Sequence, residues 1–495
     1  MMRLIALLLS LVVCLCASCL GPSTPEDKAI KAVRNLGGKV TREDNLPGHP
    51  VVAVNLSWTK VTDAGLTELK AIGGLQELDL SGTDITDASL RNLKELKGLQ
   101  RLNLWGTRIT GTGLKDLKEL KGLQVLGLGN TWITDAGLGD LKELKGLQML
   151  DLSGPNITDA GLKDLKELKG LRTLYLRGTK ITDAGLKGLQ EMTGLEVLDL
   201  RVAKELSDAG LKELRELKGL QSLDVFGTNI TDAGLKDLRE LKGLKKLNLS
   251  FTEITDAGLK ELKELAGLQW LELKGTQVTD AGLKELKQLK GLRELALGEG
   301  WSGGMITDVG LKEVQELKAL ETLDLGGTGI TDAGLKDLKE LDGLQRLGLS
   351  NTKVTDAGLN ELRQLTNLRE LNLNFIRITD AGVKDLKGLK ALQRLELRGT
   401  AITDAGLREL KELDGLQMLN LCETKITDSG LKELREFRNL QELNLNDTQV
   451  TDAGLKELKE LKGLQRLDTV GTKATGAGLN ALRKALPNTS VIGPY

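Results

Sequence analysis

Residues 75–87 read Leu75-Gln-Glu-Leu78-Asp-Leu80-Ser-Gly-Thr83-Asp-Ile85-Thr86-Asp87, and close copies of this segment recur from Val51 almost to the end of the chain. The copies return about every 24 residues, and 18 of them can be aligned. One extra residue enters near Val202, and four enter between Gly298 and Met305. Because repetition at such a period indicates units that stack on one another, the sequence predicts a solenoid.

Each copy combines two hydrophobic patterns. Leu78 and Leu80 alternate with Asp79, which predicts a strand with the leucines on the buried face and Asp79 exposed. In another copy Leu259, Leu262 and Leu265 are spaced by three, which predicts the inner stripe of a short helix. A Thr or Asp before this stripe is expected to cap the helix. The unit is therefore a strand, a loop, a short helix and a second loop.

A single unit buries too few side chains to offset the entropy lost when it becomes ordered, so the copies are expected to fold as one continuous array. This predicts that Leu78, Leu80, Leu102 and Leu104 are all buried. On the opposite face of the same strands, Asp79 and Asn103 should be exposed.

The repeat resembles the leucine-rich-repeat family, whose signature is Leu-x-x-Leu-x-Leu-x-x-(Asn/Cys)-x-Leu, over residues 51 to about 480. Its Ile-Thr-Asp ending is similar to the cysteine-containing subclass, in a shortened bacterial form. The resemblance implies an α/β fold, a right-handed horseshoe-shaped solenoid with a parallel sheet on the concave face and short helices on the convex face. Thr takes the place of Asn or Cys, as at Thr59, Thr83, Thr107 and Thr472, and its hydroxyl is expected to bond loop backbone along the stack.

The first 18 residues predict a signal peptide, because Arg3 precedes an apolar run over residues 4–15 and small residues follow. Cys16-Ala17-Ser18-Cys19 resembles a bacterial lipobox, although Cys16 stands where Leu is usual. The resemblance implies a lipid on Cys19. The expected location is outside the cytoplasm, as a cell-envelope lipoprotein or as a secreted protein; an uncleaved membrane anchor is the least favoured alternative.

The remaining chain is divided by its pattern into three parts. Residues 19–50 are predicted to form an N-terminal helical cap, which begins at Thr24-Pro25, and a bridge. Residues 51–480 form the solenoid. Residues 481–495 form a C-terminal cap, in which Leu486-Pro487 ends the last helix and residues 490–492 add a closing strand. The pattern shows no second domain. Cys422 is the one cysteine outside the N-terminal targeting segment, residues 1–19.

Composition argues against several functions. The 69 basic and 70 acidic residues nearly cancel, which gives no support for nucleic-acid or anionic-membrane binding. With His49 as the single histidine, no catalytic triad or metal-ligand cluster can be drawn, so neither an enzyme nor a cofactor is predicted. The recurring Asp is interpreted as a helix cap and not as a calcium ladder. The GxGxxG at residues 298–303 is interpreted as an exposed loop, because a solenoid lacks a dinucleotide crevice.

Residues that depart from the repeat are the candidate binding residues. Trp105, Tyr175, Phe226 and Trp270 are expected at outward strand positions, Trp132 in a strand-to-helix loop and Trp301 in the insertion. Charged neighbours complete the predicted patch: Arg177, Asp199, Arg201 and Asp224. Exposed aromatic anchors beside charges are typical of interfaces, while neutral drift is the alternative explanation.

These observations favour a monomeric extracytoplasmic scaffold that binds a protein partner through the concave face. A structural or adhesive envelope protein is the first alternative. A ubiquitin-ligase substrate-recognition repeat is a second, which the absence of an F-box-like segment disfavours. Glycan binding through the tryptophans is a third. The identity of the partner does not follow from the sequence.

Overall fold

The computed structural model describes residues 24–45, 47–298 and 305–493. The chain forms two compact units, Met1–Glu205 and Leu206–Tyr495. The boundary falls beside Val202, where one extra residue interrupts the 24-residue spacing.

The first unit begins with helix α2 (Pro25–Asn35), which buries Ala29, Ile30 and Val33. The Thr24 hydroxyl accepts a hydrogen bond from the Asp27 N–H (3.0 Å), and Asp27 accepts one from the Thr24 N–H (3.0 Å). These bonds form the predicted N-terminal cap. In the predicted bridge, β1 (Lys39–Arg42) pairs antiparallel with β2 (Val51–Asn55). This strand precedes the repeats, and its antiparallel pairing lies outside the predicted parallel array.

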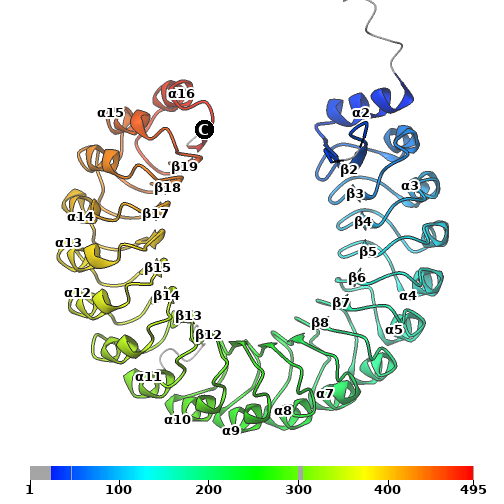
Figure 1. The fold of residues 1–495 in the computed structure, drawn as a ribbon, viewed down its shortest axis with the longest axis horizontal. Coiled ribbons are helices and arrows are strands. Elements are labelled where there is room, and N and C mark those ends of the chain that lie inside the picture. Colours follow the sequence, from blue (N-terminus) through cyan, green and yellow to red (C-terminus); the bar gives the residue numbers. More distant parts are fainter. Residues whose placement is uncertain (1–23, 46, 299–304, 494–495) are drawn as a thin grey trace, which may run out of the picture. The chain divides into compact units, whose positions relative to one another are not determined.

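The other strands of the first unit are parallel and in register, so that Leu78, Leu102 and Leu126 lie side by side. They are β3 (Glu77–Asp79), β4 (Arg101–Asn103), β5 (Val125–Gly127), β6 (Met149–Asp151), β7 (Thr173–Tyr175) and β8 (Val197–Asp199). The connecting helices are η1 (Asp63–Ala71), α3 (Asp87–Leu93), η2 (Leu114–Glu119), α4 (Asp135–Leu138), η3 (Gly139–Glu143), α5 (Asp159–Leu165), α6 (Asp183–Leu186) and η4 (Lys187–Leu189). Within the unit, strands follow one side and helices the other (Figure 1).

The second unit repeats this arrangement with parallel strands. Its strands are β9 (Ser222–Asp224), β10 (Lys246–Asn248), β11 (Trp270–Glu272), β12 (Glu294–Ala296), β13 (Thr322–Asp324), β14 (Arg346–Gly348), β15 (Glu370–Asn372), β16 (Arg394–Glu396), β17 (Met418–Asn420), β18 (Glu442–Asn444), β19 (Arg466–Asp468) and β20 (Ser490–Ile492). Strand β20 is the closing strand that the sequence predicted, and it follows the last helix, which ends at Ala485 with Leu486 as its C-cap.

Short helices separate these strands. They are α7 (Asp208–Glu213), η5 (Leu214–Glu216), α8 (Asp232–Leu238), α9 (Asp256–Leu259), η6 (Lys260–Glu264), α10 (Asp280–Leu283), η7 (Lys284–Gln288), α11 (Asp308–Val314), η8 (Gly334–Glu340), α12 (Asp356–Leu359), η9 (Asn360–Gln364), α13 (Asp380–Val383), η10 (Lys384–Gly388), α14 (Asp404–Leu410), η11 (Gly430–Glu436), α15 (Asp452–Leu455), η12 (Glu457–Glu460) and α16 (Gly476–Ala485). Many are 3₁₀ turns, because leucines spaced by three match a helix with three residues per turn.

The core between sheet and helices is a ladder of leucines. Leu78, Leu80, Leu102 and Leu104 are buried, as predicted. Asp79 and Asn103 are half-buried instead of exposed. Neighbouring strands lie only about 4.8 Å apart, so that outward side chains of one strand shield those of the next.

The recurring Asp joins consecutive repeats. Asp135 accepts hydrogen bonds from the Thr158 N–H (2.9 Å) and the Thr158 hydroxyl (2.6 Å), which belong to the next repeat. The helix cap is made by Thr158 itself, whose hydroxyl accepts a hydrogen bond from the Ala160 N–H (3.3 Å). The prediction that this Asp caps its own helix is corrected accordingly: it forms an inter-repeat ladder of charge-assisted hydrogen bonds.

The second recurring threonine also differs from expectation. The Thr83 hydroxyl donates to the Leu80 carbonyl (2.6 Å), and the Thr107 hydroxyl donates to the Leu104 carbonyl (2.7 Å). These bonds stay within one repeat and do not run along the stack. They close the turn after each strand and satisfy a buried hydroxyl.

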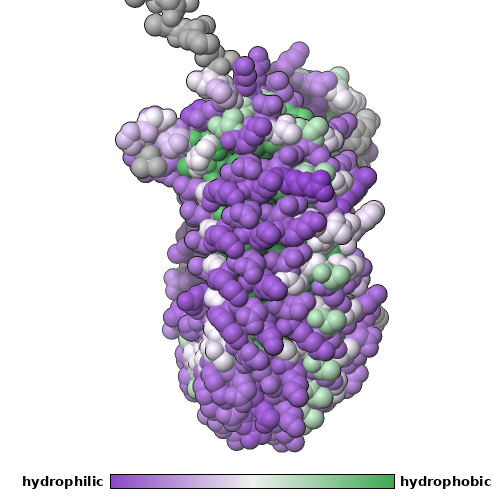
Figure 2. Space-filling model, turned by 90° about the vertical axis from the view of Figure 1, so that its right-hand side faces the viewer, coloured by the Kyte–Doolittle hydropathy of each residue, from purple (hydrophilic) through white to green (hydrophobic). Residues whose placement is uncertain are grey.

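The helix side of the first unit is mostly hydrophilic (Figure 2). Exposed ion pairs link neighbouring repeats there: Lys97–Glu119, Lys121–Glu143, Lys145–Glu167 and Lys169–Glu191. Such pairs add little stability and mainly keep the surface soluble. Among the helices of the described residues, none is both long and apolar enough to span a membrane.

Candidate functional site

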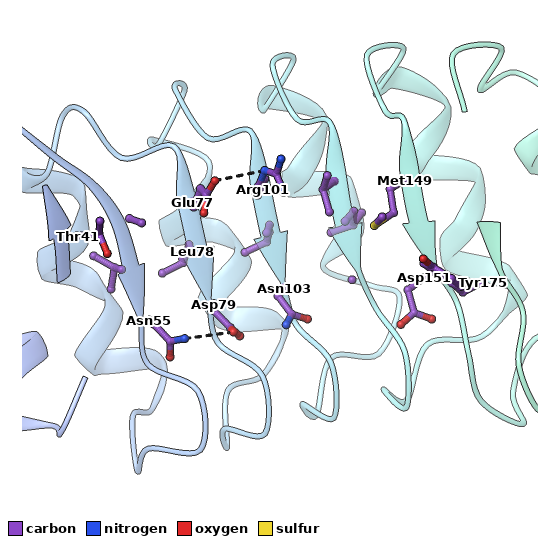
Figure 3. Close-up of a pocket in the computed structure, with 16 residues that line it drawn as sticks. Thr41, Asn55, Glu77, Leu78, Asp79, Arg101, Asn103, Met149, Asp151 and Tyr175 are labelled. Carbon is purple, nitrogen blue, oxygen red and sulfur yellow. Dashed lines mark hydrogen bonds and ion pairs between the residues drawn. The ribbon is translucent and has the colours of Figure 1, made fainter. Parts of the chain in front are cut away.

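We call the surface formed by side chains that point from the sheet away from the helices the strand face. On the strand face of the first unit, a hollow of about 490 Å³ extends across β2 to β7 (Figure 3). Its apolar lining includes Val125 and Met149, and its polar lining includes Arg101, Asp151 and Tyr175. This surface therefore combines apolar contact area with charge.

Gly127 ends β5 at the position where the neighbouring strands carry Asn103 and Asp151, and Gly129 lies two residues beyond β5. A Cβ atom at Gly127 would lie 2.7 Å from Asn103 Oδ1, and one at Gly129 would lie 2.7 Å from Asp151 Oδ2. Any side chain at these positions would displace Asn103 or Asp151. The Asn103 and Asp151 side chains thus occupy the space that the two glycines leave.

Of the four charged residues that line the hollow, Arg101 and Glu77 pair with each other. Arg101 lies 3.3 Å from the Glu77 carboxylate, and Asn55 donates a 3.5 Å hydrogen bond to Asp79 (Figure 3). Asp151 differs, because its Oδ1 accepts one hydrogen bond from the Ser153 N–H (2.8 Å). No Lys or Arg nitrogen of the described residues lies within 4 Å of its carboxylate.

A second hollow, of about 680 Å³, adjoins the first and shares Asp151 and Tyr175 with it. Trp105, Arg177 and Arg201 also line it. Burial, followed by the Asp199 and Asp151 carboxylates, raises the pKa of the Tyr175 hydroxyl. Tyr175 therefore stays neutral and offers an aromatic surface to both hollows.

Asp199 was predicted as a binding residue, but its side chain is only 6% exposed. Arg201 holds it through Nε (2.9 Å) and Nη2 (2.5 Å). This bidentate pair uses the carboxylate, so Asp199 positions Arg201 and contributes little surface of its own.

The aromatic residues of the first unit lie partly off the predicted strands. Trp105 follows β4 by two residues, so its assignment to a strand was wrong, and its ring centroid lies 5.9 Å from that of Trp58. Trp58 is 72% exposed, has a φ of 58° and lies over Gly82. A large residue in this left-handed region is strained. Trp132 is 63% exposed in its loop, as predicted, but lines neither hollow.

The remaining predicted residues lie in the second unit. Trp270 begins β11 and is half-buried, as is Phe226, which follows β9 and was wrongly assigned to a strand. The Phe226 ring lies 5.0 Å from that of Phe251, and the Phe226 N–H donates to Asp224 (3.0 Å). The predicted patch is thus divided between the two units. Trp301 and Cys19 lie outside the described residues.

Two further groups in the second unit were not found from the sequence. Lys274 pairs with Asp324 (2.6 Å) on the strand face. Cys422 is buried, and ligand atoms of Cys422, Glu423 and Asp447 lie within 4.8 Å of one another, although Arg398 binds Glu423 (2.5 Å). Burial raises the pKa of the Cys422 thiol, which disfavours the thiolate that a nucleophile or metal ligand requires.

Two family profiles match the sequence of the chain. A profile described as leucine-rich repeat region matches residues 55–299, and one described as leucine-rich repeat matches residues 318–339, 364–387 and 438–459. No curated protein sequence matches the chain.

Several solved structures resemble it. An internalin from Listeria monocytogenes is 24% identical with a TM-score of 0.46, covering 80% of this chain and 95% of its own. A leucine-rich-repeat protein from Leptospira interrogans is 24% identical with a TM-score of 0.46, covering 87% and 94%. A plant peptide hormone receptor, solved in complex with its hormone, is 15% identical with a TM-score of 0.34, covering 91% and 93%. On the matched profiles and the observed repeat of parallel strands and short helices, the chain is a leucine-rich-repeat protein.

Proposed function

We propose that this chain is an exported scaffold that binds a protein partner through the strand face of its first unit. The observation that carries the proposal is the pair of adjoining hollows that share Asp151 and Tyr175. Gly127 lines the first hollow without a side chain, and Trp105 lines the second.

The dimensions of this surface suit a polypeptide. Strands β2 to β7 are six neighbours about 4.8 Å apart, so the first hollow extends over about 24 Å. An extended segment rises about 3.3 Å per residue, so about seven residues would cross it. Half-buried aromatic and apolar side chains surrounded by charges supply the central contacts that protein interfaces use.

Export is the second part of the proposal, and it is supported by the sequence of residues 1–19. These residues lie outside the described part of the chain. We propose that residues 1–18 are removed as a signal peptide and that Cys19 receives a lipid, which would hold the scaffold at the cell envelope.

Capture of partners by the immobilised chain from the envelope extract of the source cells tests the binding function. Tyr175→Ala removes the ring shared by both hollows and should weaken capture at least tenfold, with little change in melting temperature, because Tyr175 is not part of the leucine core. Trp132→Ala is the matched control, since it removes an exposed aromatic ring outside both hollows. Equal capture by wild type and Tyr175→Ala would refute this binding surface.

A further inference from the structure

We infer that the first hollow receives a Lys or Arg side chain of the bound partner and that Asp151 is its charge partner. The inference rests on the proposed function and deepens it, because it specifies the chemistry of the residue that the strand face recognises.

Asp151 has no ion-pair partner among the described residues. Asp79 in the same hollow also has no cation, but both of its carboxylate oxygens accept hydrogen bonds, Oδ1 from Ser81 and Oδ2 from Asn55, whereas other carboxylates of the strand faces are bound by cations. Asp199 is bound by Arg201 (2.5 Å), Glu77 by Arg101 (3.3 Å) and Asp324 by Lys274 (2.6 Å). Among the residues that the structure describes, Asp151 has the Ser153 N–H on Oδ1, and Oδ2 receives no hydrogen bond. A half-buried carboxylate with a free oxygen favours a cationic ligand.

The space around this carboxylate suits a long basic side chain. Gly127, which pairs with Asp151, adds no side chain to the lining, and Val125 and Met149 form apolar walls. Lys and Arg bury their hydrocarbon stems against apolar surface while the charged end reaches a polar group. A stem lying on Val125 and Met149 would bring its cation to the Asp151 carboxylate.

The other charges nearby are compatible with this occupant. Arg101 faces the first hollow, but it is paired with Glu77. Arg177 lines the second hollow and not the first. Asp79 adds a second negative charge to the lining of the first hollow.

Selection from a phage library of random 12-residue peptides on the immobilised chain tests the inference. Wild type should enrich peptides with Lys or Arg beside apolar residues. Asp151→Asn keeps an oxygen for the Ser153 N–H but removes the charge, so it should fold normally and lose this enrichment. Asp324→Asn is the matched control, because Asp324 lies at the same strand position but already has Lys274, and it should enrich the same peptides as wild type.

Binding of a synthetic copy of one enriched peptide then measures the coupling free energy between Asp151 and the basic residue of the peptide. Replacing its basic residue by Met should weaken binding at least tenfold to wild type and less than twofold to Asp151→Asn. Enrichment of peptides without basic residues, or equal enrichment of basic peptides by Asp151→Asn, would overturn the inference. If those peptides still lose binding to Tyr175→Ala, the proposed binding surface stands while the inference fails. Failure to enrich any peptide also counts against it, and capture of partners then decides the proposed function separately.

Discussion

Asp256 joins two neighbouring repeats of the second unit, and its removal should cost more than that of an ordinary surface carboxylate. It accepts hydrogen bonds from the Thr279 N–H (2.7 Å) and hydroxyl (2.6 Å), and both residues are half-buried. Hydrogen bonds to charged groups contribute about 1.5–3 kcal/mol each. Because both residues are partly exposed, each of these two bonds is expected at the lower end of this range. Asp256→Ala, which removes both, should therefore lower the free energy of unfolding by about 3 kcal/mol.

Asp256→Asn separates the two bonds. The amide oxygen can still accept from the Thr279 N–H but carries no charge, so about half of the loss is expected, roughly 1.5 kcal/mol. Urea unfolding followed by circular dichroism measures both values. Glu253→Ala is the control, because Glu253 is an exposed carboxylate of the same repeat. An Asp256→Ala loss no greater than that of Glu253→Ala would refute the ladder as a stabilising element.

Three other predictions follow from the same contacts and from the sequence. Side-chain and backbone hydrogen bonds from Thr475 hold the pKa of the Asp452 carboxyl below its ordinary 3.8, so the stability that they add is present above that pH and is lost as the pH falls further. The melting temperature should therefore fall below about pH 4, and by less in Asp452→Asn. A Cβ at Gly282 would lie 2.3 Å from Asp256 Oδ1, so Gly282→Ala should destabilise by about 1–3 kcal/mol, whereas Gly476→Ala, with no atom within 4 Å of the added Cβ, should be nearly neutral. When cells are grown with radioactive fatty acid, the wild-type protein should be labelled and the Cys19→Ala variant should not. Equal labelling of the two proteins would show that Cys19 carries no lipid.

The repeating part of the fold could be predicted from the sequence because every copy carries the same spacing of leucines. Leu78 and Leu80 alternate with polar residues, as a half-buried strand requires. A stack of consecutive repeats is the arrangement that buries all of the recurring leucines. The antiparallel β1–β2 pair could not be predicted in this way, because residues 39–50 lie outside the repeat and carry no periodicity of their own.

The candidate site was only partly predictable. Tyr175 could be identified because it is bulkier than its counterparts in other repeats. Gly127 could not, because a repeat position without a side chain gives no sign that it lines a hollow. From the sequence, Asp199 was expected to contact a binding partner, but Arg201 binds its carboxylate. Its pairing depends on side-chain packing, which the sequence pattern does not contain.

The central claim, that the strand face of the first unit binds a protein, is tested most directly by photo-crosslinking in the source cells. A photoreactive phenylalanine analogue is placed at position 175 on the strand face, and at position 142 on the helix side as the control. We expect irradiation to give a discrete crosslinked protein from position 175 and none from position 142. Crosslinking from position 142 alone, or from neither position, would contradict binding through this face.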